Sequence, residues 1–228
     1  MSKTKKKSPP NLADVSFDYW LMFLDCRVQD EKLAEVTKLA NTVTSNRQRY
    51  EQVARSLGTM PWWFVGLIHA MEASLNFTKH LHNGDPLTAR TKQVPAGRPV
   101  DNPKGNPKEG PSAKNPYTWE ESAQDALRLK GLDKWTDWTI RASLYKLEAY
   151  NGWGYRLYHP TVPSPYLWSY TNHYSKGKYA ADGKWSANLV SKQPGAAAIL
   201  RILVDNGTVF PIDYVGDFPT PSSTTMYA

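Results

Sequence analysis

The stretch PWWFVGLIHAMEASL, residues 61–75, carries the clearest structural pattern in the chain. Its apolar side chains recur at spacings of three and four residues, which is typical of one buried helix face. These side chains are Phe64, Leu67, Ile68, Met71 and Leu75. Pro61 suits the first turn of a helix, where its missing N–H has no partner to lose. We therefore expect a helix that begins near Pro61 and buries this face in the core.

Similar spacing on both sides of this stretch predicts further helices. Before it, the expected buried faces are Phe17, Trp20, Leu21 and Leu24, then Val36, Leu39, Ala40 and Val43, then Tyr50, Val53 and Leu57. After it, Thr118 and Glu121 have the spacing of a capping box, in which two side chains satisfy two free backbone N–H groups. The helix that follows should end at Gly131. Two more helices are expected, over residues 140–151 and 196–203.

The chain changes character after the helix of residues 61–75. Asn-Gly and Pro-Ala-Gly turn signals separate short polar segments over residues 76–98, and this pattern predicts a small β-hairpin. Residues 95–116 are rich in proline and glycine and lack apolar periodicity, so a long loop is expected there. Residues 152–186 are rich in glycine, proline, tyrosine and tryptophan, which indicates structured loops or short helices.

These patterns predict a mainly α fold with a small β-hairpin insertion, formed by one domain. The domain should cover residues 12–206. Residues 1–11 contain the run KTKKK and are expected to form a disordered basic tail. Residues 207–228 are expected to form an irregular C-terminal tail.

The composition limits the function classes. Among 228 residues, 28 Lys and Arg against 21 Asp and Glu give a net charge of +7, which suits an anionic partner. The single cysteine, Cys26, excludes an intrachain disulfide framework. No segment approaches the roughly 18 apolar residues of a membrane span. No secretory signal precedes Leu12, so we expect synthesis in the cytoplasm and no stable membrane insertion.

Two carboxylates near residue 72 form the most informative pattern. Val65, His69, Glu72 and Asn76 share a stripe beside the apolar one, which places Glu72 at the rim of the core. Burial and the negative helix end should both raise the pKa of the Glu72 carboxyl. Asp85 lies in a turn and should stay ionised. One protonated and one ionised carboxyl is the pair that glycoside hydrolysis uses.

Further side chains are candidates for a binding cleft. Thr88 and Thr91 follow Asp85 and are placed to orient a water molecule. Tyr150, Asn151 and Trp153 suit stacking on sugars and hydrogen bonding to an acetamido group. Glu148 is either a reserve catalytic carboxylate or a surface residue paired with Arg141. Asn172 and Tyr174 lie in a segment whose aromatic, amide and basic groups suit a polar, anionic glycan.

The histidines leave a different chemistry open. His80 and His82 would share one face of a strand, and His69 or Asp85 would complete a zinc site. No HExxH pattern supports this, so the histidines are more simply explained as support for a cleft, and no metal or other cofactor is predicted. The lysines form no recognition-helix pattern, which argues against nucleic acid as a partner.

The order Glu72, Asp85, Thr91 resembles that of the catalytic residues in phage-type lysozymes, across roughly residues 60–200. The segment Glu72-Ala73-Ser74 is similar to the Glu-Ser of lytic transglycosylases, with one residue inserted. Ala149-Tyr150-Asn151 is similar to an Ala-Tyr-Asn segment of the same enzymes. The chain thus resembles the lysozyme superfamily, which implies a two-lobed α+β fold.

The resemblance implies a monomeric peptidoglycan hydrolase, phage-encoded or virion-associated, that cleaves the β-1,4 bond between N-acetylmuramic acid and N-acetylglucosamine. Glu72 would be the general acid, Asp85 the stabiliser or base, and Thr91 would position water. The implied substrate contacts are His69, Ser74, Thr88, Glu148, Tyr150, Asn151, Trp153, Asn172 and Tyr174. Alternatives are a lytic transglycosylase, a chitinase, a zinc-dependent amidase or peptidase, and a non-catalytic wall-binding virion protein.

Overall fold

The structure is a computed structural model that describes residues 7–100, 117–181 and 183–210. Its α-helices in these residues are α1 (Leu12–Leu24), α2 (Leu33–Ser45), α3 (Arg47–Arg55), α4 (Trp62–Ala73), α5 (Trp119–Leu129), α6 (Ile140–Asn151), α7 (Gly154–Tyr158), α8 (Pro165–Trp168) and α9 (Ala196–Asp205). Short 3₁₀ turns cover Asp30–Lys32 and Leu132–Lys134. Two strands, β1 (Lys178–Ala181) and β2 (Lys184–Ser186), form an antiparallel hairpin. The prediction of a mainly α fold with one small hairpin is therefore confirmed at this level.

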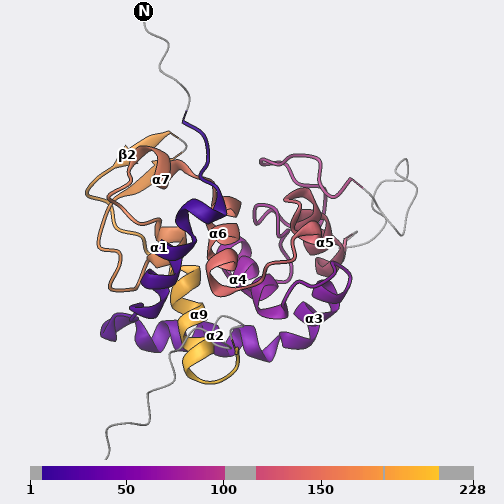
Figure 1. Ribbon diagram of the computed structural model, residues 1–228. Helices are drawn as coiled ribbons and strands as arrows, with labels where there is room; N and C mark the ends of the chain where they lie inside the picture. Colours follow the sequence, from indigo (N-terminus) through magenta and orange to yellow (C-terminus); the bar gives the residue numbers. More distant parts are fainter. Residues whose placement is uncertain (1–6, 101–116, 182, 211–228) are drawn as a thin grey trace, which may run out of the picture.

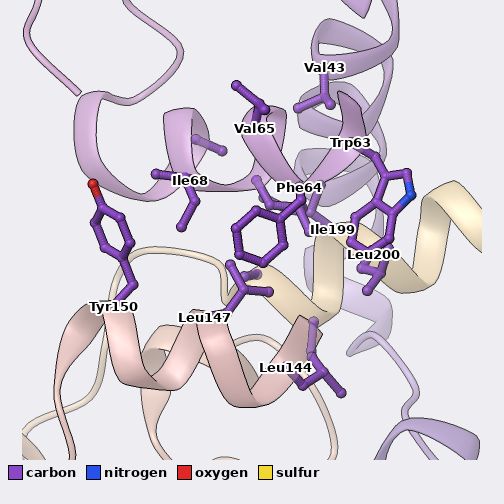
Figure 2. Close-up of a cluster of buried hydrophobic side chains, with 14 of the residues drawn as sticks. Val43, Trp63, Phe64, Val65, Ile68, Leu144, Leu147, Tyr150, Ile199 and Leu200 are labelled. Atoms are coloured by element: carbon purple, nitrogen blue, oxygen red, sulfur yellow. The ribbon is translucent and has the colours of Figure 1, made fainter. Parts of the chain in front are cut away.

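Helix α4 forms the centre of the core. Its residues from Trp63 to Ala70 are all buried, so the helix is enclosed on every side rather than along one stripe. Figure 2 shows Phe64 and Ile68 of α4 facing Leu147 of α6, with residues of α9 behind them. Met71 and Glu72, in the last turn of α4, are partly exposed, so these side chains of the central helix can reach a surface pocket.

Gly66 allows α4 to lie close to α2 and α3. A Cβ atom at this position would come within 2.6 Å of Val43 Cγ1 and 3.2 Å of the Tyr50 ring. Any side chain here would therefore push α4 away from its two neighbours.

Two groups of elements flank this centre. In Figure 1, the hairpin and α7 lie on one side of α4 and α6, and α5 lies on the other side. Helix α1 packs on α6, α9 packs on α2 and α4, and α8 joins α6 and α9. This arrangement brings the end of α4, the end of α6 and the hairpin to one region of the molecule.

Most predicted helices are confirmed, and their ends agree with the capping and glycine signals in the sequence. The Thr118 hydroxyl accepts a hydrogen bond from the Glu121 N–H at 3.2 Å, and the Glu121 carboxylate accepts from the Thr118 N–H at 2.8 Å. This is the predicted capping box of α5. Gly131, just beyond α5, is left-handed with φ 67°. Helix α6 ends at Asn151 as expected, and α9 extends two residues beyond the predicted Leu203.

The predicted buried face of α1 is wrong. Phe17, Leu21 and Leu24 are 66%, 49% and 43% exposed, while Tyr19 and Phe23 are fully buried. Both sets of residues have helical spacing, so the local pattern does not distinguish them. The side of α1 that packs on α6 was decided by tertiary contacts, including a hydrogen bond from the Tyr19 hydroxyl to Glu148.

The hairpin lies elsewhere in the chain than predicted. Residues 76–98 form turns with a single isolated bridge between Lys79 and Pro86, whereas the hairpin spans residues 178–186. In 76–98, Asn83, Asp85 and Thr91 bind backbone groups through their side chains, which replaces strand pairing.

The predicted long loop and tails lie partly outside the described residues, which omit 1–6, 101–116 and 211–228. Within the described N-terminal residues, the Pro10 carbonyl accepts a hydrogen bond from the Tyr145 hydroxyl at 3.1 Å, and the Leu157 carbonyl accepts one from Lys7 at 2.7 Å. Among the described helices, none has the length and hydrophobicity needed to cross a membrane.

Candidate functional site

Glu72 lies in the last turn of α4, where the chain reverses direction. Ser74 and Leu75 both have positive φ, at 52° and 58°, and the Leu75 N–H donates to the His69 carbonyl at 3.2 Å. Two left-handed residues in succession end the helix abruptly. Glu72 is therefore the last carboxylate on the buried helix, at the point where α4 leaves the core.

The environment of Glu72 favours its protonated form. Burial raises the pKa of its carboxyl to about 7, although the Tyr166 hydroxyl and the charge of Lys130 act in the opposite direction. The Tyr166 hydroxyl donates a hydrogen bond to Glu72 Oε1 at 2.7 Å. The Lys130 ammonium forms no ion pair with Glu72 in the described structure and donates instead to the Tyr150 carbonyl at 3.1 Å. The carboxyl can therefore hold or release a proton near neutral pH.

A pocket of about 530 Å³, which we call the Glu72 pocket, is lined by two neighbours of this residue. Met71, which precedes Glu72, and Tyr166, which binds it, both line the pocket, and Glu72 itself is partly exposed but is not one of the lining residues. The other lining residues are Asn151, Gly152, Gly154, Tyr155, Tyr158, Pro165, Lys178, Tyr179, Ala181, Gly183, Ser191 and Gln193. The pocket thus combines tyrosine rings with a few amide and hydroxyl groups.

Two contacts hold the wall of the pocket in place. At Gly195, a Cβ atom would lie 2.1 Å from the Leu167 carbonyl oxygen, so only glycine allows the start of α9 to lie against α8. This fixes α8, which carries Tyr166. The Gln193 side-chain amide donates to the Met71 carbonyl at 2.8 Å and ties the segment before α9 to the end of α4.

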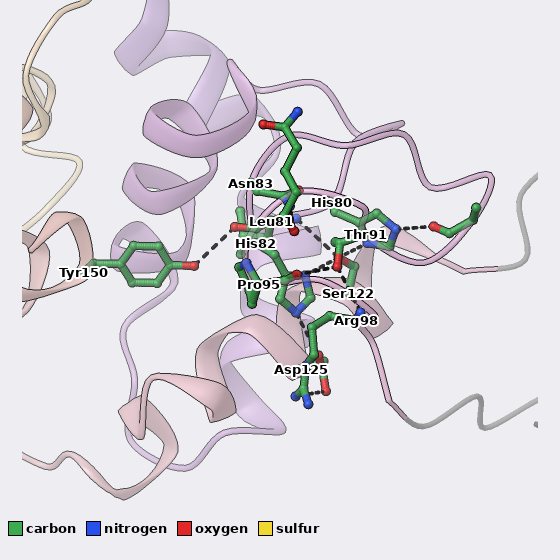
Figure 3. Close-up of polar contacts among 12 residues, drawn as sticks. His80, Leu81, His82, Asn83, Thr91, Pro95, Arg98, Ser122, Asp125 and Tyr150 are labelled. Carbon is green, nitrogen blue, oxygen red and sulfur yellow. Dashed lines mark hydrogen bonds and ion pairs between the residues drawn. The ribbon is translucent and has the colours of Figure 1, made fainter. Parts of the chain in front are cut away.

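Tyr150 and Asn151 are two predicted residues that the fold brings close to Glu72. The Tyr150 hydroxyl donates to the Leu81 carbonyl at 3.2 Å and so links α6 to residues 76–98 (Figure 3). Its ring is buried, and burial together with the charge of Glu72 raises the pKa of Tyr150 well above its usual value. Asn151 lines the Glu72 pocket. Tyr150 therefore supports the site from behind, while Asn151 faces the pocket.

Asp85 lies near the end of α4 and organises its own loop. A Cβ on the preceding Gly84 would be 3.0 Å from the Glu72 carbonyl oxygen, which shows how closely this turn approaches α4. The Asp85 carboxylate accepts hydrogen bonds from the Lys92 N–H at 2.7 Å and the Gln93 N–H at 2.9 Å. The side-chain amides of Asn83 and Gln93 also donate to it. Burial opposes ionisation, but these hydrogen bonds lower the pKa of Asp85 overall.

The hydroxyl of Thr91 is engaged within the same loop. It donates to the Pro95 carbonyl and accepts from the Arg98 N–H at 2.9 Å. Thr88 and Ser74 are exposed, and neither lines the Glu72 pocket. Within the described structure, the threonines are thus placed as loop-forming and surface residues.

His80 and His82 belong to a polar network that joins residues 76–98 to α5 (Figure 3). His80 Nδ1 lies 2.8 Å from the Ser122 hydroxyl, and its Nε2 lies 2.7 Å from the Ala89 carbonyl oxygen. His82 Nε2 lies 2.7 Å from Asp125, whose carboxylate also accepts two hydrogen bonds from the Arg98 guanidinium. This network holds residues 76–98 against α5.

The suggested zinc ligands are not assembled. His69 is fully buried among Tyr50, Phe77 and Trp119, and burial lowers its pKa to about 4. The part of the chain that the structure describes contains no group of three or more histidine, cysteine, aspartate or glutamate side chains able to hold a metal ion.

Glu148 is buried, with 3% of its surface exposed, and lines a second pocket. Its Oε2 accepts hydrogen bonds from the Tyr19 hydroxyl and, at 3.3 Å, from Arg156 Nη2. The alternative of a surface glutamate paired with Arg141 is therefore wrong, because Glu148 is enclosed between α1 and α7 and its cationic partner is Arg156.

The remaining predicted contacts are not among the residues that line the Glu72 pocket. Trp153 packs on the Tyr145 ring at 5.0 Å between centroids. Asn172 is exposed and binds the backbone at Asp25 and Arg27. The Tyr174 hydroxyl is buried between the Gly177 carbonyl and the Ser191 N–H.

Sequence analysis missed Tyr166, together with the pocket residues contributed by the hairpin. Pro165, at the first position of α8, was the local sign of the short helix that carries Tyr166. No local pattern could connect Tyr166 to Glu72, which is 94 residues earlier in the chain. Comparison of this chain with protein-family models, curated proteins and solved structures finds no match.

Proposed function

We propose that this protein is a glycoside hydrolase of lysozyme-like, two-lobed fold that cleaves peptidoglycan between N-acetylmuramic acid and N-acetylglucosamine. The observation that carries the proposal is Glu72, a carboxyl with a pKa of about 7 beside a pocket lined by tyrosines. Glycosidases need such a group, protonated at working pH, to deliver a proton to the leaving oxygen.

The pocket chemistry supports a sugar ligand. Tyr155, Tyr158 and Tyr179 line it, and aromatic rings offer flat apolar faces to sugar rings. Asn151 and Gln193 add amide donors and acceptors suited to acetamido and hydroxyl groups. In this proposal a sugar lies on the tyrosines, and Glu72 protonates the glycosidic oxygen next to it.

Asp85 is the second carboxylate of the proposal, and its lowered pKa suits an ionised stabiliser or base. One observation favours a lytic transglycosylase instead. The Asp85 carboxylate already accepts four hydrogen bonds, and both hydrogen-bonding roles of the Thr91 hydroxyl are taken within the loop. Glu72 would then act alone, first as acid and then as base, and leave a 1,6-anhydro sugar.

The net charge of +7 suits the anionic cell wall as a partner. In this proposal the protein is a monomeric endolysin or virion-associated enzyme, which its positive charge draws to the wall. Chitin is the substrate alternative, because it has the same linkage between acetamido sugars. Wall binding through this charge should weaken as the salt concentration rises.

The test is mass spectrometry of purified peptidoglycan after digestion by the wild type, Glu72→Gln and Glu31→Gln. Glu31 is exposed and serves as the matched control, so its variant should retain wild-type activity. We expect Glu72→Gln to lose at least about 10²-fold in activity, the contribution typical of a general acid. Products ending in reducing N-acetylmuramic acid identify a hydrolase, and anhydro ends identify a transglycosylase.

Three other outcomes would overturn the proposal. Equal activity of Glu72→Gln and the wild type would remove Glu72 from the chemistry. Release of free stem peptides from intact glycan would identify an amidase or peptidase. No fragments from the folded wild type, together with wall binding, would identify a non-catalytic wall-binding protein.

A further inference from the structure

The charge on the wall of the Glu72 pocket comes from strand β1. Lys178 and Tyr179 of β1 both line the pocket, and none of the described lining residues is an aspartate or a glutamate. Burial raises the pKa of the Glu72 carboxyl to about 7, so this neighbouring group is mostly uncharged in mildly acidic solution. Lys178 therefore gives the described wall of the pocket a single positive charge.

Contacts on both sides of Lys178 hold its backbone at the pocket. The preceding Gly177 has φ 98°, and a Cβ atom there would lie 3.0 Å from the Trp185 ring. Any side chain at this position would push the start of β1 away from that ring. On the other side, the Tyr179 N–H donates to the Tyr155 hydroxyl of α7 at 3.3 Å. The segment that carries Lys178 is thus anchored between β2 and α7.

The protein does not neutralise the Lys178 ammonium. Lys178 is half-buried, and within the described residues no carboxylate forms an ion pair with it. Arg156, on the neighbouring α7, differs in this respect because its guanidinium lies 3.3 Å from the Glu148 carboxylate. A cation that lines a pocket and has no anionic partner in the protein can form a charge-assisted hydrogen bond with a ligand.

The neutral groups of the pocket fit the remainder of a sugar but do not respond to its charge. Tyr155 and Tyr158 offer ring faces, and Asn151 offers an amide. The Gln193 amide N–H₂ donates to the Met71 carbonyl at 2.8 Å, and its Oε1 is an acceptor for a sugar hydroxyl or acetamido N–H. These groups suit any acetamido sugar. Among the described lining residues, only Lys178 can distinguish an acidic sugar from a neutral one.

We propose that Lys178 is the specificity-determining residue of the Glu72 pocket and selects acetamido sugars that carry a carboxylate. This inference rests on the proposed function, because it takes a sugar as the ligand. The ammonium donates to a carboxylate on a short arm of the sugar, while the sugar ring lies on the tyrosines. Chitin has no such carboxylate, so Lys178 favours peptidoglycan. The carboxylate belongs either to the lactyl group of N-acetylmuramic acid or to the peptide attached to it, since both present the same group.

The experiment is an NMR titration of the full ¹⁵N-labelled chain at pH 6 and low salt. The probes are N-acetylmuramic acid, its uncharged methyl ester, and N-acetylglucosamine. We expect the acid to bind about two- to fivefold more tightly than the ester, the range of a partly exposed ion pair, and this preference should shrink in high salt. A further titration with N-acetylmuramyl-L-alanine distinguishes the two sources, because the carboxylate of the tighter-binding probe is assigned.

Three variants locate the preference. Lys178→Met should bind the acid and the ester with equal affinity, and its affinity for N-acetylglucosamine should equal that of the wild type. Lys184→Met is the matched control, because Lys184 is an exposed lysine of the same hairpin that does not line the pocket. It should keep the wild-type preference. Glu72→Gln should also keep it, since binding at pH 6 requires no proton transfer.

The outcomes separate this inference from the proposed function. Equal affinity of the wild type for the acid and the ester, or an unchanged preference in Lys178→Met, would overturn the role of Lys178 and leave Glu72 as the proposed acid. The absence of saturable shifts with all the sugars would overturn the inference together with the sugar ligand that it assumes. The role of Glu72 is decided independently, by the products of the peptidoglycan digest.

Discussion

Glu72 and Glu148 are both carboxylates on central helices, and each accepts a hydrogen bond from a tyrosine hydroxyl. Tyr166 donates to Glu72 and Tyr19 donates to Glu148. The difference lies in the cation. Arg156 contacts Glu148 directly at 3.3 Å, whereas Lys130 influences Glu72 without contact and binds the Tyr150 carbonyl. Glu148 is thus tied to a cation by direct contact, whereas Glu72 has no contacting cation and burial raises the pKa of its carboxyl to about 7.

The largest expected effect comes from removing this counter-charge. Arg156→Leu leaves Glu148 buried without a cation, and we expect the free energy of unfolding to fall by about 3 kcal/mol. Urea denaturation at pH 7 measures this change. Arg55→Leu is the control, because the Arg55 side chain is 80% exposed and its ion pair should be worth less than about 1 kcal/mol. Equal losses in the two variants would show that Glu148 does not depend on Arg156.

Glu72→Gln should have the opposite effect on stability, and only at high pH. The folded state raises the pKa of Glu72 from 4.5 to about 7, so it binds a proton more tightly than the unfolded chain. Ionised Glu72 therefore costs stability as pH rises from about 4.5 through 7. We expect the variant to be up to about 3 kcal/mol more stable than the wild type at pH 8, and no more stable at pH 4.

Glu148→Gln provides the matched comparison for this pH dependence. It should be less stable than the wild type at pH 8, because Tyr19 and Arg156 lose an anionic acceptor. Urea denaturation of both variants at pH 4 and pH 8 measures the difference. If Glu72→Gln were less stable than the wild type at pH 8, the conclusion that ionised Glu72 lowers the stability of the fold would be contradicted.

A smaller effect should follow from removing the tyrosine hydroxyls. The Tyr166 hydroxyl stabilises ionised Glu72, so Tyr166→Phe should raise the pKa of Glu72 above about 7. The alkaline limb of the profile of kcat/KM against pH should move up by about one pH unit, since one such hydrogen bond is worth about 1.5 kcal/mol. Tyr19→Phe should leave this limb unchanged. Movement of the limb in Tyr19→Phe, or a downward movement in Tyr166→Phe, would refute this account.

The smallest expected effect concerns the distant cation. Lys130→Met removes a positive charge that lowers the pKa of Glu72. The alkaline limb should therefore move upward by less than about half a pH unit, and the movement should shrink in high salt. Profiles of kcat/KM against pH at two salt concentrations measure it. A shift that persists unchanged in high salt would indicate a structural change rather than a charge effect.

The parts of the fold that were predicted correctly depend on residues close together in sequence. The ends of α5 and α6 followed from the capping box at Thr118 and from the Asn151-Gly152 pair. Each signal involves residues within one or two helical turns, so the sequence contains all the groups that interact.

The incorrect predictions involve a choice between equivalent local patterns. Either face of α1 satisfies helical spacing, and the buried face was selected by packing on α6. Turn signals occur both in residues 76–98 and around Gly183. Only the latter has Tyr179 paired with Trp185 across strands, while Asp85 and Thr91 form loop contacts instead.

Helical spacing and helix ends are local properties, so most of the long helices, and the place of Glu72 at the end of an apolar helix, could be predicted from the chain alone. The partners of the two glutamates depended on the fold: Tyr166 for Glu72, and Tyr19 with Arg156 for Glu148. The physical reason is that a pKa depends on burial and on nearby charges, and these are contributed by residues far apart in the chain.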